Sequence, residues 1–416
     1  MATPLVHRVA RMSGRDPDED HRAATPLELL FDLTFVVAFG VAADELAHYL
    51  AEDHISTSLI AFSFVTFAIS WAWINFSWFA SAYDTDDWVF RLLTMIQMVG
   101  VLVLALGITP VFESIDEGAH VDNGVMVAGY VVMRFAMVAQ WLRAAKEDPG
   151  RRSAARTYAV TITVAQAGWV ALALASTSVG TMFAWAGLLL LIELGGPVIA
   201  ELRKGGTPWH PRHIAERHGL LVIIALGEAI LGTIVALRAV VGPEGPGWSV
   251  EAAVVGFAGV ALTFGMWWIY FVIPCGDMLA YRRSRSFGWG YGHIPLFGSI
   301  VAVGAGLHAG AFLVEHKTEL EVLDTVLTTA IPVTVYVLGI FLLYTYLTGT
   351  IDPFHSLLIG VSVALLGASV AMAAAGVDFQ WCLLVLALVP WVTVLGYELV
   401  GHRHNAEVLA RLAAES

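Results

Sequence analysis

The sequence predicts an all-α protein that crosses a membrane about twelve times. Of its 416 residues, 58% are hydrophobic and only 14% are charged, whereas soluble domains are about half apolar and about a quarter charged. The mean hydropathy is +0.73. At roughly 20 apolar residues per membrane-spanning helix, the hydrophobic residues of the chain suffice for about twelve spans. The composition therefore argues against a water-soluble enzyme.

The spans are recognised in order along the chain as uninterrupted apolar runs, each longer than the roughly 20 residues that one crossing needs. In the first half of the chain we expect helices at 26–49, 56–81, 88–111, 123–145, 156–176 and 180–201. In the second half we expect them at 214–240, 250–274, 292–314, 323–347, 354–376 and 379–401.

The spans divide the chain into four predicted segments. Residues 1–24 mix arginines with acidic residues and contain no apolar core, which predicts a disordered cytoplasmic tail and not a cleavable signal peptide. Two six-helix halves follow at 25–204 and 205–401, and a second cytoplasmic tail at 402–416. The first helix then acts as an uncleaved membrane anchor.

An internal repeat is indicated by two similar motifs. Trp71–Phe76 (WAWINF) resembles Met266–Phe271 (MWWIYF), and Glu28 and Glu216 each stand near the start of a long apolar run. Both pairs are separated by about half of the chain, so a duplicated six-helix half would keep its orientation and give a parallel 6+6 arrangement. The alternative is chance similarity, because aromatic residues are common where helices meet the membrane surface.

The distribution of cations predicts the orientation. With the N-terminus inside, 19 of the 22 Lys and Arg residues fall on the cytoplasmic side, Arg238 and Lys317 fall outside, and Arg134 lies within a span. This is a strong positive-inside signal, and it predicts a multi-pass plasma-membrane protein with both termini in the cytoplasm. The outer segments are acidic, which either concentrates cations at that surface or serves solubility alone.

The composition also limits the partners. The formal net charge of −13 argues against a nucleic-acid partner, because phosphate binding requires clustered cations. The two cysteines are distant in sequence, and His210, His213 and His218 lack the further ligands of a zinc site. We expect no cofactor and no metal, and as partners we expect membrane lipids and a cation or small-molecule substrate.

Four ionisable residues within the spans are the candidate ion or substrate pathway: Asp32, Arg134, Glu193 and Glu228. Charged groups inside a membrane are costly and usually face partners or a polar cavity. Three of these residues are acids, and Glu398 near a span end is a fourth, so four carboxylates face the single guanidinium group of Arg134. The surplus favours a cation or proton pathway, and the alternative is a structural ion pair that fixes helix register.

Four further polar residues are supporting candidates. Glu28 lies four residues before Asp32 and shares its helix face, and Glu216, His218 and His308 add polar groups to the second half.

A helix-breaking sequence follows one of the acids. Gly195-Gly196-Pro197 comes directly after Glu193 and Leu194. We expect this triplet to unwind its helix, because discontinuous helices of transporters expose carbonyl groups for cation coordination in this way.

Three blocks of sequence resemble the bacterial low temperature requirement A family. They are Thr25–Val36 (TPLELLFDLTFV), His213–Leu220 with Ala225–Ile230 (HIAERHGL and ALGEAI), and Tyr291–Leu296 (YGHIPL). The resemblance covers roughly residues 25–400. It implies a polytopic membrane protein without an assigned activity, and it draws attention to Glu28, Asp32, Glu216, His218, Gly227 and Glu228. At His218 this chain departs from the aromatic residue that the family usually has.

Three functional hypotheses follow. The first is a cation- or proton-coupled transporter or channel that uses the intramembrane carboxylates. The second is an integral-membrane enzyme or lipid-handling protein that works at the cytoplasmic interface with Glu28, Asp32, Glu216 and the loop histidines His210, His213 and His218. The third is a membrane sensor. The sequence contains no nucleophile elbow, phosphate loop or dinucleotide motif, so no catalytic residue is assigned.

Overall fold

The structure, a computed structural model, describes residues 9–17, 19, 22–242 and 247–415. Within these ranges the regular elements are all helical. Twelve helical stretches are long and apolar enough to cross a membrane. The predicted all-α polytopic fold with about twelve spans is confirmed.

The helices follow the predicted order. The first half of the chain contains α1 (Pro26–Ala51), α2 (Ile55–Tyr83), α3 (Trp88–Leu106), α4 (Ile108–Glu117), α5 (Gly124–Glu147), α6 (Arg152–Leu174) and α7 (Val179–Glu201). The second half contains α8 (Pro211–Val241), α9 (Val250–Phe271), α10 (Cys275–Tyr281), η1 (Arg283–Arg285), α11 (Ser286–Val314), α12 (Val322–Thr348), α13 (Pro353–Ala374), α14 (Phe379–Ala387), α15 (Val389–Gly396), η2 (Tyr397–Gly401) and α16 (His402–Glu415).

The chain forms two compact units. Unit 1 consists of Met1–Ala38 and Ala68–Ile214, and unit 2 of Phe39–Phe67 and Ala215–Ser416. The boundaries fall within α1, α2 and α8, so each of these helices contributes to both units.

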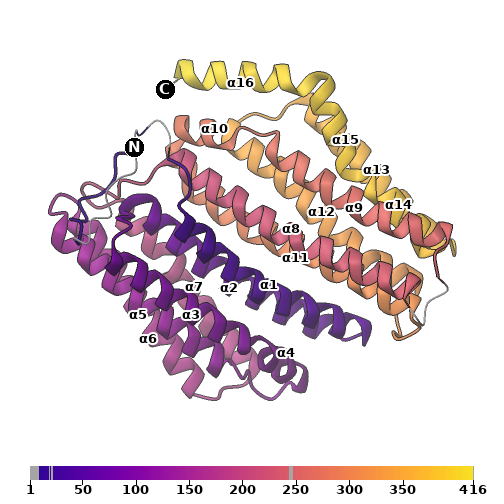
Figure 1. Ribbon diagram of the computed structural model, residues 1–416, viewed down its shortest axis with the longest axis horizontal. Coiled ribbons are helices and arrows are strands. Elements are labelled where there is room, and N and C mark those ends of the chain that lie inside the picture. Colours follow the sequence, from indigo (N-terminus) through magenta and orange to yellow (C-terminus); the bar gives the residue numbers. More distant parts are fainter. Residues whose placement is uncertain (1–8, 18, 20–21, 243–246, 416) are drawn as a thin grey trace. The chain divides into compact units, whose positions relative to one another are not determined.

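Unit 1 is held together by antiparallel neighbours. Helix α3 packs against α5, α5 against α6, and α6 against α7. Helices α3, α5 and α6 are labelled next to one another in Figure 1. Gly100 and Gly129 let α3 and α5 approach closely, since a Cβ atom at Gly100 would lie 2.7 Å from the carbonyl oxygen of Gly129. Gln97 donates a 2.8 Å hydrogen bond to Gln140 across the same interface, which supplies the polar link that buried helix pairs in membranes favour.

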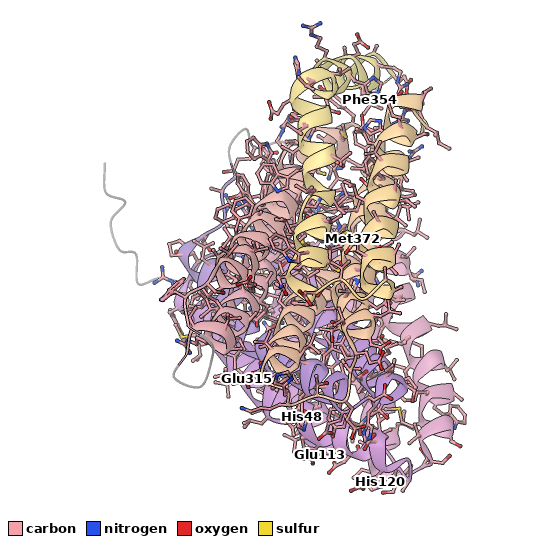
Figure 2. The ribbon with its side chains drawn as sticks, turned by 90° about the vertical axis from the view of Figure 1, so that its right-hand side faces the viewer. His48, Glu113, His120, Glu315, Phe354 and Met372 are labelled. Carbon is pink, nitrogen blue, oxygen red and sulfur yellow. The ribbon has the colours of Figure 1, made fainter. Side chains whose placement is uncertain are left out.

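Unit 2 is built around α11 and α12, which pack against each other, while α9 packs against α14 and α15 and α13 packs against α12 and α14. Phe354 and Met372 mark the course of α13 in Figure 2, and Glu315 lies toward the opposite end of this unit from Phe354. At the end of the chain, α16 turns away from α15 after the π-helical turn η2 (Figure 1).

The expected unwinding after Glu193 is wrong. Helix α7 runs without a break from Val179 to Glu201 with Pro197 inside it. The proline has no N–H to offer the carbonyl group of Glu193 four residues earlier. One missing bond is tolerated because membrane helices re-satisfy freed backbone groups through local adjustments and neighbouring helices. The glycines therefore supply no exposed run of carbonyl groups.

The described part of the predicted tail 1–24 contacts unit 1. The backbone N–H of Ala10 donates to Asp87 Oδ2 at 3.0 Å, that of Met12 to Glu147 Oε2 at 2.6 Å, and that of Arg15 to the carbonyl group of Ala82 at 2.9 Å. Residues 1–8, 18 and 20–21 of the predicted tail lie outside the described residues.

Candidate functional site

Two of the predicted pathway residues form a buried ion pair in unit 1. Arg134 of α5 donates from Nη2 to Glu193 Oε2 of α7 at 2.8 Å, and both side chains are about 95% buried. The indole Nε1 of Trp71 donates to the same carboxylate oxygen at 2.7 Å. Glu193 therefore has a cation and a second donor, as a buried carboxylate requires.

The guanidinium group of Arg134 is also fixed on its other side. Its Nη1 donates to Asn75 Oδ1 at 3.2 Å, and the Asn75 amide donates to the carbonyl group of Trp71 at 2.7 Å. The guanidinium carbon lies 5.4 Å from the ring centroid of Tyr130, within the range of a cation–π contact. The pair thus connects α2, α5 and α7.

Asp32 of α1 also has its partner on α2, but this partner is Trp73 and not Trp71. Trp73 donates from Nε1 to Asp32 Oδ1 at 2.7 Å, and both side chains are buried. The motif Trp71-Ala72-Trp73 therefore presents two indole N–H groups to two carboxylates. A large apolar ring with one donor suits this role, because it fills a buried space and still bonds an acid.

The start of α1 is organised by Glu28. The Thr25 hydroxyl accepts from the Glu28 N–H at 3.3 Å, and Glu28 Oε2 accepts from the Thr25 N–H at 2.7 Å, which is a reciprocal capping box. Pro26 occupies the first helical position, where its missing N–H costs nothing. The other oxygen of Glu28 lies 3.3 Å from His213 Nε2 and 3.9 Å from Arg22 Nη2.

A second acid, Asp84, lies near this capping box and was not singled out from the sequence. Burial and, to a smaller extent, the neighbouring Glu28 raise the pKa of its carboxyl group to about 6, although the hydrogen bond from the Asp86 N–H and the charge of Arg22 act in the opposite direction. Burial also lowers the pKa of Arg22 to about 10 and lowers the pKa of His210. This end of α1 and α2 is therefore a buried cluster of opposite charges in which an acid titrates above its usual range.

In unit 2, Glu228 of α8 is buried at 6% exposure. Within the described part of the chain, its Oε1 atom has no hydrogen-bond partner. A Cβ atom at Gly40 of α1 would lie only 3.5 Å from this oxygen, and one at Gly304 of α11 would lie 2.5 Å from the Glu228 carbonyl oxygen. The two glycines thus let α1 and α11 close around Glu228.

One helical turn further along, the same two helices carry a polar pair. Asp44 follows Gly40 by four residues and His308 follows Gly304 by four, so each lies on the face that its glycine turns toward α8. His308 Nδ1 lies 3.4 Å from Asp44 Oδ1, and the Asp44 side chain is 76% exposed. We call Glu228, Asp44 and His308 the Glu228 row; it runs from a buried carboxyl group to an exposed one.

His218 lies in an aromatic cluster of unit 2. Its ring is 4.7 Å from that of Trp289 and 4.8 Å from that of His293, measured between centroids. The Tyr270 hydroxyl lies 3.0 Å from His293 Nε2. Glu216, in contrast, is exposed on α8. The sequence singled out His218, whereas His293 and Tyr270 entered only as members of the YGHIPL block and the MWWIYF motif and were not connected with it.

The predicted pathway residues therefore fall into separate environments. Unit 1 brings Arg134 and Glu193 together and gives Asp32 an indole donor, whereas unit 2 holds Glu228 and His308. The partners Trp71, Trp73 and Asn75 form an i, i+2, i+4 pattern in the sequence, and that spacing was the available signal for them.

The chain matches a known family of bacterial proteins. A family model described as "Bacterial low temperature requirement A protein (LtrA)" matches residues 23–390. The chain belongs to this family. It is also 27% identical over 307 residues to a protein of Rhizobium meliloti (strain 1021) named "Uncharacterized protein RA0937", with 70% of each chain covered. No solved structure matches the chain significantly.

The structure gives physical meaning to the three blocks that resemble the low temperature requirement A family. The first block contains the capping box at Thr25 and Glu28 and the acid Asp32 that Trp73 binds. The second belongs to α8 and contains Glu228, and the third belongs to α11 and contains His293. Each block thus contains a buried polar side chain.

Proposed function

We propose that this member of the low temperature requirement A family is a proton-coupled transporter of the plasma membrane. The observation that carries the proposal is the buried Oε1 atom of Glu228, which no hydrogen bond satisfies within the described residues. A carboxylate without a cation or donor is costly inside a membrane, while its protonated form needs neither. Glu228 can therefore bind and release a proton.

The Glu228 row supports protons as the coupled ion. Its members are two carboxyl groups and an imidazole, all of which exchange protons, and intramembrane acids and histidines in sequence are typical of proton relays. The exposed Asp44 and the half-buried His308 stand at the open end of the row. Because the cations predict cytoplasmic termini, we place this end on the outer side of the membrane.

The ion pair in unit 1 has a structural role in this proposal. Arg134 compensates the charge of Glu193, and Trp73 binds Asp32. These links hold α1, α2, α5 and α7 in register.

The test is proton flux in proteoliposomes that contain the purified full-length chain and a trapped pH-sensitive dye. A K⁺ diffusion potential set with valinomycin drives protons across the membrane, in the presence and absence of external Na⁺. We expect Glu228→Gln to slow the change of internal pH at least tenfold. The matched control is Glu251→Gln, which replaces a fully exposed glutamate of α9 and should leave the flux unchanged. Equal flux in wild type and Glu228→Gln would rule out this role.

Lipid handling is the second candidate, and one observation favours it. Unit 2 contains an apolar pocket of about 480 Å³ whose lining includes Phe62, Thr66, Pro295, Ala302 and Ile331. Its size and apolar walls suit a lipid acyl chain. The sequence-based form of this hypothesis used Glu28, Asp32, Glu216 and the loop histidines His210, His213 and His218, and none of these residues lines the pocket.

Native mass spectrometry tests this second candidate. Wild type should retain a lipid through delipidating washes, and Ala302→Phe, which fills the pocket, should lose it. Equal retention in the two proteins would exclude the pocket as the lipid site.

A further inference from the structure

Three side chains of unit 2 that sequence reasoning did not connect meet near the start of α13. Asp352 immediately precedes α13, His355 lies in its first turn, and His404 lies in the first turn of α16. Asp352 Oδ2 is 3.0 Å from His355 Nδ1 and 3.1 Å from His404 Nε2. One ligand atom from each of the three residues lies within 4.8 Å of the others.

We propose that Asp352, His355 and His404 bind a divalent first-row transition metal ion such as Zn²⁺. Zinc is bound at roughly 2.0–2.2 Å by imidazole nitrogen and carboxylate oxygen. Ligand atoms around a tetrahedral ion are therefore roughly 3.3–3.6 Å apart. Asp352 Oδ2 lies 3.0 and 3.1 Å from the two imidazole nitrogens, so an outward shift of a few tenths of an ångström would admit the ion. Two imidazoles and a carboxylate suit zinc and its neighbours better than Mg²⁺ or Ca²⁺, which prefer oxygen ligands.

The carboxylate is already oriented for this role. Asp352 Oδ1 accepts a 3.1 Å hydrogen bond from the Phe354 N–H and caps α13. This bond occupies one oxygen and turns Oδ2 toward the two histidines. Phe354 is labelled at this end of α13 in Figure 2.

One tyrosine, Tyr344, contacts His355 directly and contacts Asn405, the residue next to His404. The ring of His355 packs against that of Tyr344 at 4.6 Å between centroids. The Tyr344 hydroxyl donates to Asn405 Oδ1 at 3.0 Å, and Asn405 is the buried neighbour of His404. Tyr344 therefore contacts both of the elements that carry imidazole ligands, as outer partners in metal sites do.

Three protein ligands leave at least one coordination position open. The side chains of Asp352, His355 and His404 are 18%, 19% and 30% exposed, so water can complete the coordination, as in zinc sites with three protein ligands. The competing arrangement is a carboxylate that accepts hydrogen bonds from both imidazoles without a metal.

The position of the site gives metal binding a structural consequence. Helix α16 is held to unit 2 by the buried stripe Asn405, Val408 and Leu412 and by an ion pair between Arg282 and Glu415. A metal at Asp352, His355 and His404 would join the start of α16 to the start of α13. The metal would therefore hold α16 in place against α13. Helix α16 begins directly after the π-helical turn η2, and such turns are frequent at functional sites.

The test is calorimetric titration of Zn²⁺ into the purified full-length chain in detergent, after chelator treatment and removal of the chelator. We expect one Zn²⁺ per chain and at least about a 100-fold weaker Kd in His404→Ala, since even outer partners of a metal site contribute roughly 10–100-fold. Tyr344→Phe should weaken binding by roughly tenfold on the same scale. The matched control is His402→Ala, which removes an exposed histidine two residues from His404 and should change nothing.

Two further measurements keep the result unambiguous. Thermal unfolding without metal shows whether His404→Ala folds, and Asp352→Asn tests the same site without removing a histidine. Zn²⁺ should also slow amide hydrogen exchange in α16 of wild type and not in either variant, because a ligand bound to the folded state stabilises it. A Kd that is unchanged in His404→Ala and Asp352→Asn, or a loss of equal size in His402→Ala, would overturn the metal site and leave a hydrogen-bonded triad only.

Discussion

Glu193 in unit 1 and Glu228 in unit 2 differ in the partners that the structure gives them. Both are glutamates within apolar helices, at 5% and 6% exposure. Glu193 accepts hydrogen bonds from the guanidinium group of Arg134 and the indole of Trp71. Glu228 faces Gly40, and within the described residues its Oε1 atom has no hydrogen-bond partner.

The difference separates a structural acid from a candidate transport acid. A compensated carboxylate gains from staying charged, since removal of either partner leaves the other buried and unpaired. An uncompensated carboxyl group gains from binding a proton and can release it when its surroundings change. Burial within a span is therefore not sufficient evidence for a transport role, and the local partners decide.

The largest effect is expected from breaking the compensated pair. Arg134→Met should lower the free energy of unfolding by about 3–5 kcal/mol, because it leaves the Glu193 carboxylate buried without its cation. Thermal unfolding in detergent, followed by circular dichroism, measures the loss. The double variant Arg134→Met/Glu193→Gln should recover most of it. If the double variant is as unstable as the single one, lost packing and not lost charge is the cause.

A pH-dependent effect is expected at Asp84, outside the spans. Its folded-state pKa of about 6 lies above the 3.8 of an unperturbed aspartate, so the folded state binds this proton more tightly than the unfolded state. The stabilisation of the folded state by proton binding at Asp84 is fully present below about pH 4 and is lost as the pH rises through about 6. At about 1.36 kcal/mol per pKa unit, the free energy of unfolding of Asp84→Asn should rise relative to that of wild type by up to about 3 kcal/mol between pH 4 and pH 8.

Chemical unfolding of both proteins across this pH range measures the gain at Asp84. A difference between Asp84→Asn and wild type that stays constant with pH would contradict the shifted pKa.

A smaller loss is expected where Asp32 depends on an indole donor. Trp73→Phe keeps an aromatic ring and removes the N–H group that binds Asp32, which should cost about 1.5–3 kcal/mol for a hydrogen bond to a charged group. The matched control is Trp267→Phe in the similar motif of α9. Trp267 is 44% exposed, so its replacement should cost less than about 0.5 kcal/mol. Equal losses in thermal unfolding would show that the donor to Asp32 is unimportant.

The smallest change in stability is expected at the uncompensated acid. Glu228→Gln preserves the size of the side chain, and among the described residues Glu228 forms no ion pair that the change would remove, so the free energy of unfolding should stay within about 1 kcal/mol of wild type. Glu193→Gln should cost several times more, because Arg134 loses its partner. The same thermal unfolding assay compares the two variants, and equal destabilisation would abolish the distinction between the two acids.

The spans could be predicted from the sequence because a membrane crossing depends on length and hydropathy, which are local properties. The intramembrane acids were visible for the same reason. The ion pair of Arg134 with an acid was also among the alternatives that the sequence offered. The indole donors to Asp32 and Glu193 were not, because Trp71 and Trp73 of α2 reach these acids only through tertiary packing. The similar motifs of α2 and α9 illustrate this, since Trp71 and Trp73 are buried beside acids, whereas Trp267 and Trp268 are partly exposed.

The other features that the sequence did not reveal also depend on tertiary packing. Asp84 has a shifted pKa because packing buries it beside Glu28, and nothing local in the sequence reports that burial. The proposed metal ligands His355 and His404 lie on different helices, whereas the histidines at 210–218 attracted attention by being close in sequence. Pro197 suggested a broken helix, and α7 accommodates it because packing satisfies what one missing hydrogen bond leaves free.

Infrared spectroscopy of the membrane-reconstituted chain tests most directly whether Glu228 changes its protonation. Spectra recorded as the pH is varied report the carboxylic-acid C=O stretch, which disappears when a carboxyl group ionises. We predict that wild type and Glu193→Gln share a titrating band that is absent in Glu228→Gln. A band that persists in Glu228→Gln and is lost in Glu193→Gln would contradict the assignment, because the compensated acid would then be the one that exchanges its proton.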